Sequence, residues 1–268
     1  MQFLTSFHLG HFNASGRRAY VGDDGRILDS EWAGEHVLPV VGVVVDTVCR
    51  VVGDARHDEA LAEVAKLDAE GNHPLGLSHL QVFFRTMVFD YRGFLSEAGS
   101  NAFNRDWMKR LAFGFYRELE DFNVRGRGAS GFTFGIKDFL GSISLPLGGV
   151  QGGRDDWAAQ FAESSKDRRE VEAFRTEYLY RSGYKAIDAS SSFFITEKSH
   201  TGLGPARCQE GDHLAIFHGC PTPLVVRSAR ERIQGKPTYQ VVGPCYLYGM
   251  MNGEMFDKTG VVTGMYLV

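Results

Sequence analysis

Short apolar runs separated by turn residues dominate the last third of the chain. Between residues 191 and 254 each run is bounded by Gly, Pro or charged residues, which is typical of short strands in an antiparallel sheet or small barrel. The runs are Phe193–Thr196, Leu214–His218, Leu224–Arg227, Tyr239–Val242 and Cys245–Met250. Residues 261–268 add a last apolar run. We therefore expect a C-terminal β sheet over residues 191–268.

The N-terminal part predicts further strands between residues 12 and 52. The valine-rich stretch 36–52 favours strand, either as a buried strand pair or as a strand whose second half winds into a helix. Its apolar part contains Pro39, Asp46 and Arg50 and falls short of the roughly 20 residues that cross a bilayer. We expect buried strands here and no membrane span.

The middle of the chain has helical periodicity. Apolar residues at helical spacing predict helices over 55–69, 78–91, 105–120 and 157–180, interrupted by a glycine-rich, aromatic-bearing loop over 126–153. The expected fold class is α+β. A helical middle, residues 54–180, packs on a small antiparallel sheet or barrel built from both ends of the chain, in one domain over residues 1–268.

Charge and motifs remove several classes of function. The net charge of −4 provides no basic surface for nucleic acid, and the first residues lack the pattern of a secretory signal, so we expect a cytoplasmic protein. Cys-x-x-Cys pairs, His-Glu-x-x-His, phosphate-binding and dinucleotide motifs are missing from the sequence. We expect no cofactor and no metal, and free thiols rather than a disulfide; the oligomeric state is left open.

Several blocks carry a resemblance to a known family. In the C-terminal run they are Phe193-Phe194-x-Thr196, Gly202-Leu203-Gly204-Pro205, Glu210-Gly211-Asp212, Pro223-x-Val225-Val226-Arg227 and Val242-Gly243-x-x-Tyr246-x-Tyr248-Gly249-x-Met251-x-Gly253-Glu254. Two earlier blocks are Phe12-Asn13-Ala14-Ser15-Gly16, which leads to Val43-Val44-Val45-Asp46-Thr47-Val48, and Phe83-Phe84-Arg85-Thr86-x-x-x-Asp90. In this order they resemble the C-terminal region of the fungal heterokaryon-incompatibility (HET) proteins, over residues 12 to 254. The opening motif of the N-terminal HET domain has no match here, which implies either a fragment or a free-standing descendant.

The resemblance leaves three functions open. One is a non-catalytic interaction or regulatory module of a HET protein. The second, which we favour at this stage, is a cofactor-free pericyclase similar in kind to the norbornene-forming Diels–Alderase of sordarin biosynthesis, acting on a small apolar, terpenoid-like substrate. Such an enzyme needs only a near-attack geometry and hydrogen-bond donors aimed at a carbonyl. The third is an isomerase or cyclase with acid/base chemistry.

Residue type and expected face select the candidate site residues. As hydrogen-bond donors for a substrate carbonyl we select Tyr246, Tyr248, His218 and Arg85. As walls of an apolar pocket we select Phe84, Tyr91, Trp107, Phe115 and Phe194, and as acid/base groups Glu254 and Asp90. Each has a structural alternative: core packing for the aromatics, a tie between helices for Arg85 and Asp90, hydrogen bonding to backbone for the tyrosines and the histidine, and capping or anchoring of its turn for Glu254.

Overall fold

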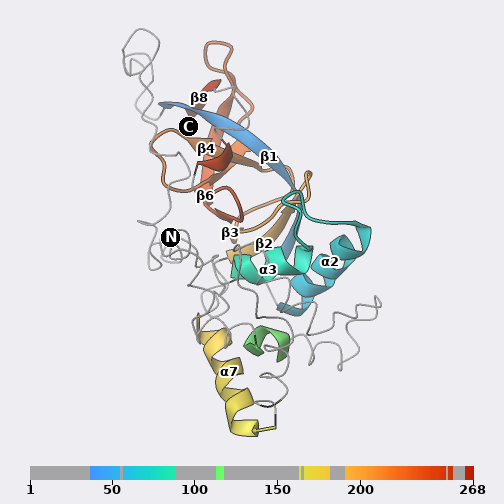
Figure 1. The fold of residues 1–268 in the computed structure, drawn as a ribbon. Helices are drawn as coiled ribbons and strands as arrows, with labels where there is room; N and C mark the ends of the chain where they lie inside the picture. The colour runs from blue at the N-terminus through green and yellow to red at the C-terminus, as the bar shows by residue number, and fades with distance from the viewer. Residues whose placement is uncertain are drawn as a thin grey trace. The chain divides into compact units, whose positions relative to one another are not determined.

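The structure is a computed structural model that describes residues 37–54, 57–87, 113–117, 163, 166–181, 191–251, 253–255 and 263–268. The chain divides into two compact units, one of residues 1–55 with 189–268 and one of residues 56–188. The first contains the strands and the second the described helices (Figure 1). The fold is α+β, as expected. A single domain over residues 1–268, and the packing of helices on the sheet, stay predictions.

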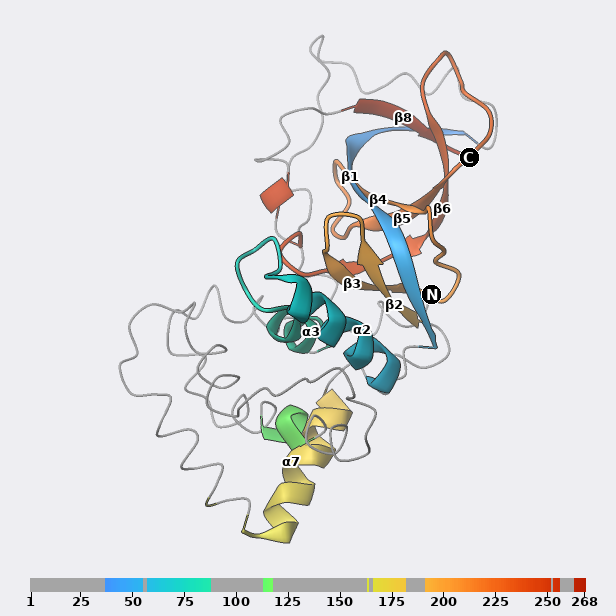
Figure 2. The same cartoon turned by 90° about the vertical axis from the view of Figure 1, so that its right-hand side faces the viewer.

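Five strands close into a barrel, which Figure 2 shows as a ring. The neighbours around it are β1–β4, β4–β5, β5–β6, β6–β8 and β8–β1. The bounds are β1 Leu38–Asp54, β4 His213–Phe217, β5 Leu224–Ser228, β6 Thr238–Pro244 and β8 Thr263–Leu267. Closure pairs both edges of each strand, so the barrel is a self-contained β unit. The expected origin of the sheet in both ends of the chain is confirmed, since β1 lies between β4 and β8.

Strand β1 is one strand of 17 residues, so a strand pair and a strand followed by a helix are both wrong. Its first half pairs with β8 and β4, and its second half pairs with β2, Ser191–Thr196. The pairing shifts between Val44 and Asp46, and Lys198 Nζ donates to the Val45 carbonyl oxygen at 2.7 Å. The bulge therefore lets one strand leave the barrel and continue in a second sheet.

The apolar runs did not predict two features of the structure, one in this second sheet and one in the barrel. The second sheet continues from β2 to β3, Thr201–Pro205, which no run contains, and then to β7, Tyr246–Leu247. In the barrel, β6 and β8 pair in parallel, which corrects the expectation of a purely antiparallel sheet. Parallel pairing joins segments far apart in sequence, so local turn patterns do not reveal it.

The barrel core is apolar and tightly packed. One cluster of buried residues includes Val43, Val45, Val48, Phe194, Leu214, Ile216, Val225 and Leu247, and a second includes Ala215, Phe217, Val226, Tyr239 and Met265. Gly42 lies where β1 passes both β4 and β8. A Cβ atom at Gly42 would collide with the Ile216 carbonyl oxygen and lie 2.9 Å from the Phe217 Cα. Glycine at this position therefore permits the close approach of the two strands.

The helical unit contains α2, His57–Glu70, α3, His79–Met87, and α7, Arg168–Arg181, and residues 113–117 are also helical. The first two match the expected helices within a few residues over the described range. Asp68 Oδ1 accepts hydrogen bonds from the backbone N–H of His79 at 2.5 Å and of Leu80 at 3.4 Å. The last turn of α2 thus caps the start of α3. No described helix is long and apolar enough to cross a membrane.

The remaining predictions of secondary structure concern residues outside the described ranges. They are the glycine-rich loop 126–153, most of the helix 105–120, the first part of the helix 157–180, and the N-terminal strands before residue 37. A continuous helical middle is therefore not confirmed.

Candidate functional site

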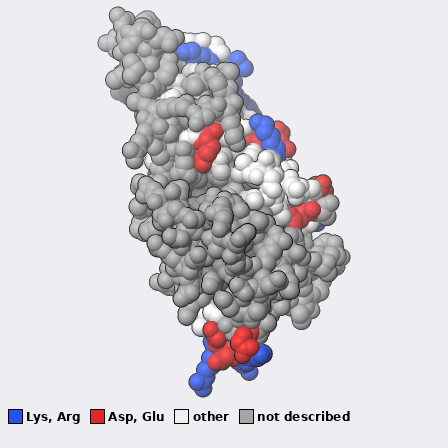
Figure 3. Space-filling view, in the orientation of Figure 1, with Lys and Arg blue, Asp and Glu red and all other residues white. Residues whose placement is uncertain are grey.

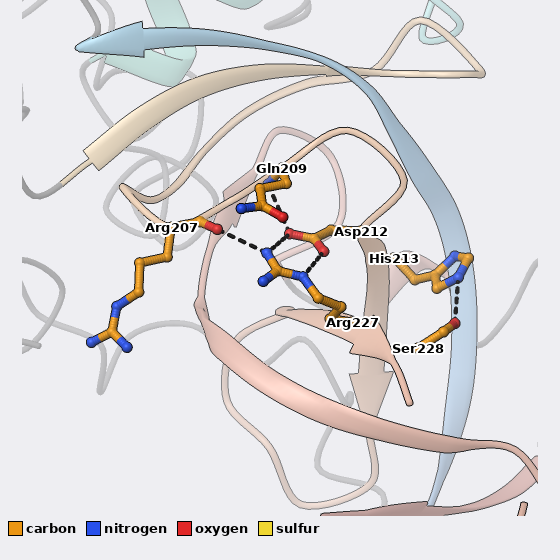
Figure 4. Close-up of polar contacts among 6 residues, drawn as sticks. All are labelled: Arg207, Gln209, Asp212, His213, Arg227 and Ser228. Atoms are coloured by element: carbon orange, nitrogen blue, oxygen red, sulfur yellow. Dashed lines mark hydrogen bonds and ion pairs between the residues drawn. The ribbon is translucent and has the colours of Figure 1, made fainter. Parts of the chain in front are cut away.

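An ion pair between β5 and the turn before β4 is bonded to several neighbouring groups of the barrel (Figure 4). Arg227 Nε donates to Asp212 Oδ1 at 2.7 Å, and an Arg227 terminal nitrogen donates to Oδ2 at 3.0 Å. The Asp212 side chain is 2% exposed and that of Arg227 is 37% exposed. Hydrogen bonding to Asp212 raises the pKa of Arg227, so the guanidinium stays charged at neutral pH.

This pair organises residues 207–212, which we call the Asp212 turn. Asp212 Oδ2 accepts from the Gln209 backbone N–H at 2.8 Å, and Arg227 donates to the Arg207 carbonyl oxygen at 2.9 Å. The turn is also bonded to β1, because Val48 N–H donates to the Asp212 carbonyl oxygen and Gly211 N–H donates to that of Val48, each at 2.8 Å. The turn therefore presents exposed Arg207, Gln209 and Glu210 on a backbone fixed to two strands.

His213 follows directly and links three neighbouring strands. Its Nε2 lies 3.0 Å from Ser228 Oγ on β5, and its Nδ1 lies 3.3 Å from Thr47 Oγ1 on β1. Its ring meets the ring of Tyr239 on β6 edge to face, with centroids 5.8 Å apart. Antiparallel pairing sets His213 opposite Thr47 on β1 and opposite Val226 on β5, which lies two residues before Ser228.

The contact of Ser228 with His213 has the distance of a nucleophile and its base. However, the group on the other ring nitrogen is a threonine hydroxyl, which carries no charge to stabilise an imidazolium as the carboxylate of a catalytic triad does. The Asp212 carboxylate is committed to Arg227. The arrangement thus suits a rigid polar surface better than acyl transfer.

All four cysteines have free thiols, and two of them are buried near the Asp212 turn or in the core beneath it. Burial, with a smaller effect of the Asp212 charge, raises the pKa of Cys208 to about 12. Burial also raises the pKa of Cys245. A thiol with such a pKa stays protonated and unreactive near neutral pH. Among the described residues, no group of three or more His, Cys, Asp and Glu side chains has the arrangement of a metal site.

The donors selected from sequence lie in both units. Tyr246 and Tyr248 are buried at 1% and 6% exposure around the short strand β7. His218 is half-buried just after β4, where its backbone N–H donates to the Val41 carbonyl oxygen at 2.9 Å. Arg85 is buried in α3 of the helical unit. Arg85 belongs to the helical unit and the other three donors belong to the barrel unit, so a site shared by all four stays a prediction.

The selected aromatics that are described are buried in the two cores. The rings of Phe84 and Phe115 lie 5.0 Å apart in the helical unit, so the structure does bring these two together. Phe194 belongs to the barrel core. Glu254 is half-buried in a short helical turn. Tyr91, Trp107 and Asp90 lie outside the described residues, and the catalytic roles of all these residues stay predictions.

Sequence reasoning missed the pairing of Asp212 with Arg227 and the contacts of His213. Two signals were available, since both residues of the pair fall in blocks that carry the family resemblance. The turn between Phe217 and Leu224 also makes β4 and β5 a hairpin, and its register sets Asp212 next to Arg227. A charged residue at each open end of a hairpin is a candidate cross-strand pair.

The fold and this turn together define a closed β-barrel unit with a bonded polar turn at its surface. Residues 145–268 match the family model of the Het-6 β-barrel domain. The match contains β2 to β8, whereas β1, which completes the ring between β4 and β8, lies before it. The resemblance of this part of the chain to the C-terminal region of HET proteins is therefore supported.

A curated relative agrees with the family match. Heterokaryon incompatibility protein 6, OR allele, of Neurospora crassa is 39% identical over 75 residues, which are 28% of this chain and 11% of the relative. The chain therefore spans only a small part of that protein. No solved structure matches.

Proposed function

We propose that this chain supplies a non-catalytic interaction module to a heterokaryon-incompatibility system. The observation that carries the proposal is the match of residues 145–268 to the Het-6 β-barrel domain. The relative named as a heterokaryon incompatibility protein adds a second, shorter similarity. The sequence alone left this function as the alternative to a pericyclase.

The geometry of the barrel surface is compatible with such a role. Residues 207–212 are held by bonds to β1 and β5, so their exposed side chains lose little conformational freedom when a partner binds. Such preorganisation lowers the entropic cost of association. A module that recognises a protein partner benefits from a surface of this kind.

The pericyclase and the acid/base enzyme gain no support from the family match or from the curated relative. The described aromatics selected as pocket walls are fully buried. A concave region among the described residues lies beside the start of α7 and is lined by charged side chains, Glu163, Lys166, Asp167, Arg168 and Glu170. Such a lining does not suit an apolar substrate.

A heterokaryon assay tests the proposal. The full chain is expressed from an inducible promoter in one of two otherwise compatible Neurospora crassa strains, once with the OR allele of incompatibility protein 6 in the other strain and once without it. We expect induction to reduce heterokaryon growth in an allele-dependent way. Vigorous growth in both pairings contradicts the proposal.

A matched variant and an enzyme assay complete the design. Gly42→Glu, which breaks the barrel, should abolish the effect at equal expression. In parallel, the purified chain is incubated with a cyclopentadiene-bearing diterpenoid aldehyde. Accelerated formation of a single cycloadduct also contradicts the proposal, because it makes the chain an enzyme.

A further inference from the structure

The connection between β5 and β6 forms an ordered, positively charged projection. Residues 229–237, which we call the basic hairpin, extend away from the barrel (Figure 2). They carry Arg230, Arg232 and Lys236, all exposed, against one carboxylate, Glu231. Figure 3 shows Lys and Arg side chains at the end of the barrel where this hairpin lies. This local excess of positive charge contrasts with the net charge of −4 of the whole chain.

The tip of the basic hairpin has a defined conformation. Ile233 and Lys236 exchange two backbone hydrogen bonds, at 3.2 and 2.9 Å. Gln234 and Gly235 between them have φ angles of 52° and 74°, as in the two-residue turns that match strand twist. A left-handed conformation at a residue other than glycine costs free energy. The surrounding contacts must therefore maintain it.

Side chains of β8 and of the hairpin itself provide these contacts. Tyr266 Oη donates to Gln234 Oε1 at 2.9 Å, and Lys236 Nζ lies 6.0 Å from the centre of the Tyr266 ring. Arg232 donates to the Gly235 carbonyl oxygen at 3.2 Å, and the Thr238 hydroxyl donates to the Glu231 carbonyl oxygen. The cations are thus carried on a framework that is formed before any partner arrives.

These cations remain available to a partner. In the described part of the chain, none of Arg230, Arg232 and Lys236 has a carboxylate within ion-pair distance, whereas Arg227 at the base of the hairpin is already bonded to Asp212. An exposed guanidinium recognises a carboxylate through two parallel hydrogen bonds. A preorganised set of such groups favours an acidic ligand.

We propose that the basic hairpin is a docking surface for an acidic segment of a protein partner. The inference rests on the proposed function and adds the chemistry of the partner. A short acidic peptide is favoured over nucleic acid or an anionic membrane, because those extended polyanions also face the repulsion of a chain with net charge −4. A peptide engages the hairpin alone.

Fluorescence anisotropy tests the inference on the full chain. The probe is a fluorescein-labelled 12-residue peptide of alternating Asp and Glu, and the reference probe replaces them with Asn and Gln. The test variant is Arg230→Ser/Arg232→Ser/Lys236→Ser. The matched control is Lys166→Ser/Arg168→Ser/Arg169→Ser, which removes the same charge from exposed positions of the other unit.

We expect the wild type and the control to bind the acidic peptide, with affinity that falls as NaCl rises from 50 to 300 mM. The test variant should bind about tenfold more weakly, because three exposed charge contacts are lost. Arg230→Ser/Lys236→Ser keeps the bond from Arg232 to Gly235 and should show an intermediate loss. In this second variant the hairpin keeps that bond, so its loss of affinity reports the missing charges and not a loosened hairpin.

Several outcomes overturn the inference. The first is equal affinity of the test and control variants for the acidic peptide. The second is that the wild type binds the neutral peptide as well as the acidic one, or binds neither. The third is that the wild type binds single-stranded DNA or phosphatidylserine vesicles more tightly than the acidic peptide. The heterokaryon assay separates the two proposals. If the test variant loses the peptide but keeps the incompatibility effect, the docking site is wrong and the proposed function stands; if peptide binding behaves as expected without any incompatibility effect, the proposed function fails.

Discussion

Arg227 and Asp212 form a two-point ion pair in which Nε and a terminal nitrogen of the guanidinium donate to separate carboxylate oxygens, at 2.7 and 3.0 Å. The aspartate is almost fully buried and the arginine lies at the surface. The ion pair also fixes the backbone of the turn, because the same two side chains form hydrogen bonds with the backbone of residues 207 and 209. The pair therefore connects a surface turn to the barrel wall.

Removal of Arg227 alone should destabilise the protein, because Asp212 then stays charged and buried. We expect Arg227→Ala to cost about 2 kcal/mol of unfolding free energy, because it leaves the buried Asp212 carboxylate without its cation. In Arg227→Ala/Asp212→Asn the cost should be clearly smaller than the sum of the single costs. Urea unfolding of the four proteins measures this, and additive costs would show that the pair does not act as a unit.

Position 42 should tolerate no side chain larger than that of glycine. Gly42→Ala should cost about 3 kcal/mol, since the new methyl group meets backbone atoms of β4 that cannot move without opening the barrel. The matched control is Gly264→Ala on the neighbouring strand β8, where the nearest atom is the flexible end of Lys236 at 3.3 Å. Thermal unfolding of both variants checks the prediction, and equal Tm losses would contradict it.

The comparison of sequence with structure shows which features are local. The apolar runs of β2, β4, β5, β6 and β8 were recognisable because each alternates with turn residues over a few positions. Strand β3 was not, because Thr201–Pro205 contains two glycines and little apolar surface. Its glycines have a tertiary reason: a Cβ atom at Gly202 would lie 2.6 Å from the Phe194 ring. Such close approaches leave no periodic pattern.

The continuous strand β1 was ambiguous for a similar reason. Asp46 and Thr47 interrupt its valines and resemble a turn or a helix start, yet they lie at a bulge where the strand passes from one sheet to the other. Asp46 is buried and its Oδ1 accepts the Thr47 backbone N–H at 2.9 Å. The candidate site was harder still to predict, because pairs such as Thr47 and His213 come from distant segments.

Tyr266 should support the basic hairpin through its hydroxyl group. Tyr266→Phe removes the bond to Gln234 but keeps the ring beneath Lys236, so the unfolding free energy should fall by only about 1 kcal/mol. Affinity for the acidic peptide should fall about threefold, because the left-handed turn is no longer held. Tyr239→Phe, which changes a barrel tyrosine outside the hairpin, is the control. If Tyr239→Phe lost more affinity for the peptide than Tyr266→Phe, the conformation of the hairpin would not determine peptide binding.

The buried thiol of Cys208 should make the protein less stable at alkaline pH. Burial raises the pKa of this thiol from 9.0 to about 12, so the folded protein keeps a proton that the unfolded chain releases. The contribution is fully present below pH 9 and is lost as the pH rises toward 12, by at most about 4 kcal/mol. Other groups also titrate in this pH range, so the quantity of interest is the difference in unfolding free energy between the wild type and a variant that lacks this thiol. The unfolding free energies of the wild type and Cys208→Ala are compared at pH 7, 9, 10 and 11.

We expect Cys208→Ala to be less stable than the wild type at pH 7, because it leaves a small cavity in the core. The gap should narrow above pH 9, since only the wild type then loses the thiol contribution. Cys49→Ala is the matched control. Its cysteine is exposed, although partial burial raises the pKa of this thiol as well, so the gap should change less. A gap between wild type and Cys208→Ala that stays constant from pH 7 to 11 would mean that the Cys208 thiol ionises as readily in the folded protein as in the unfolded chain.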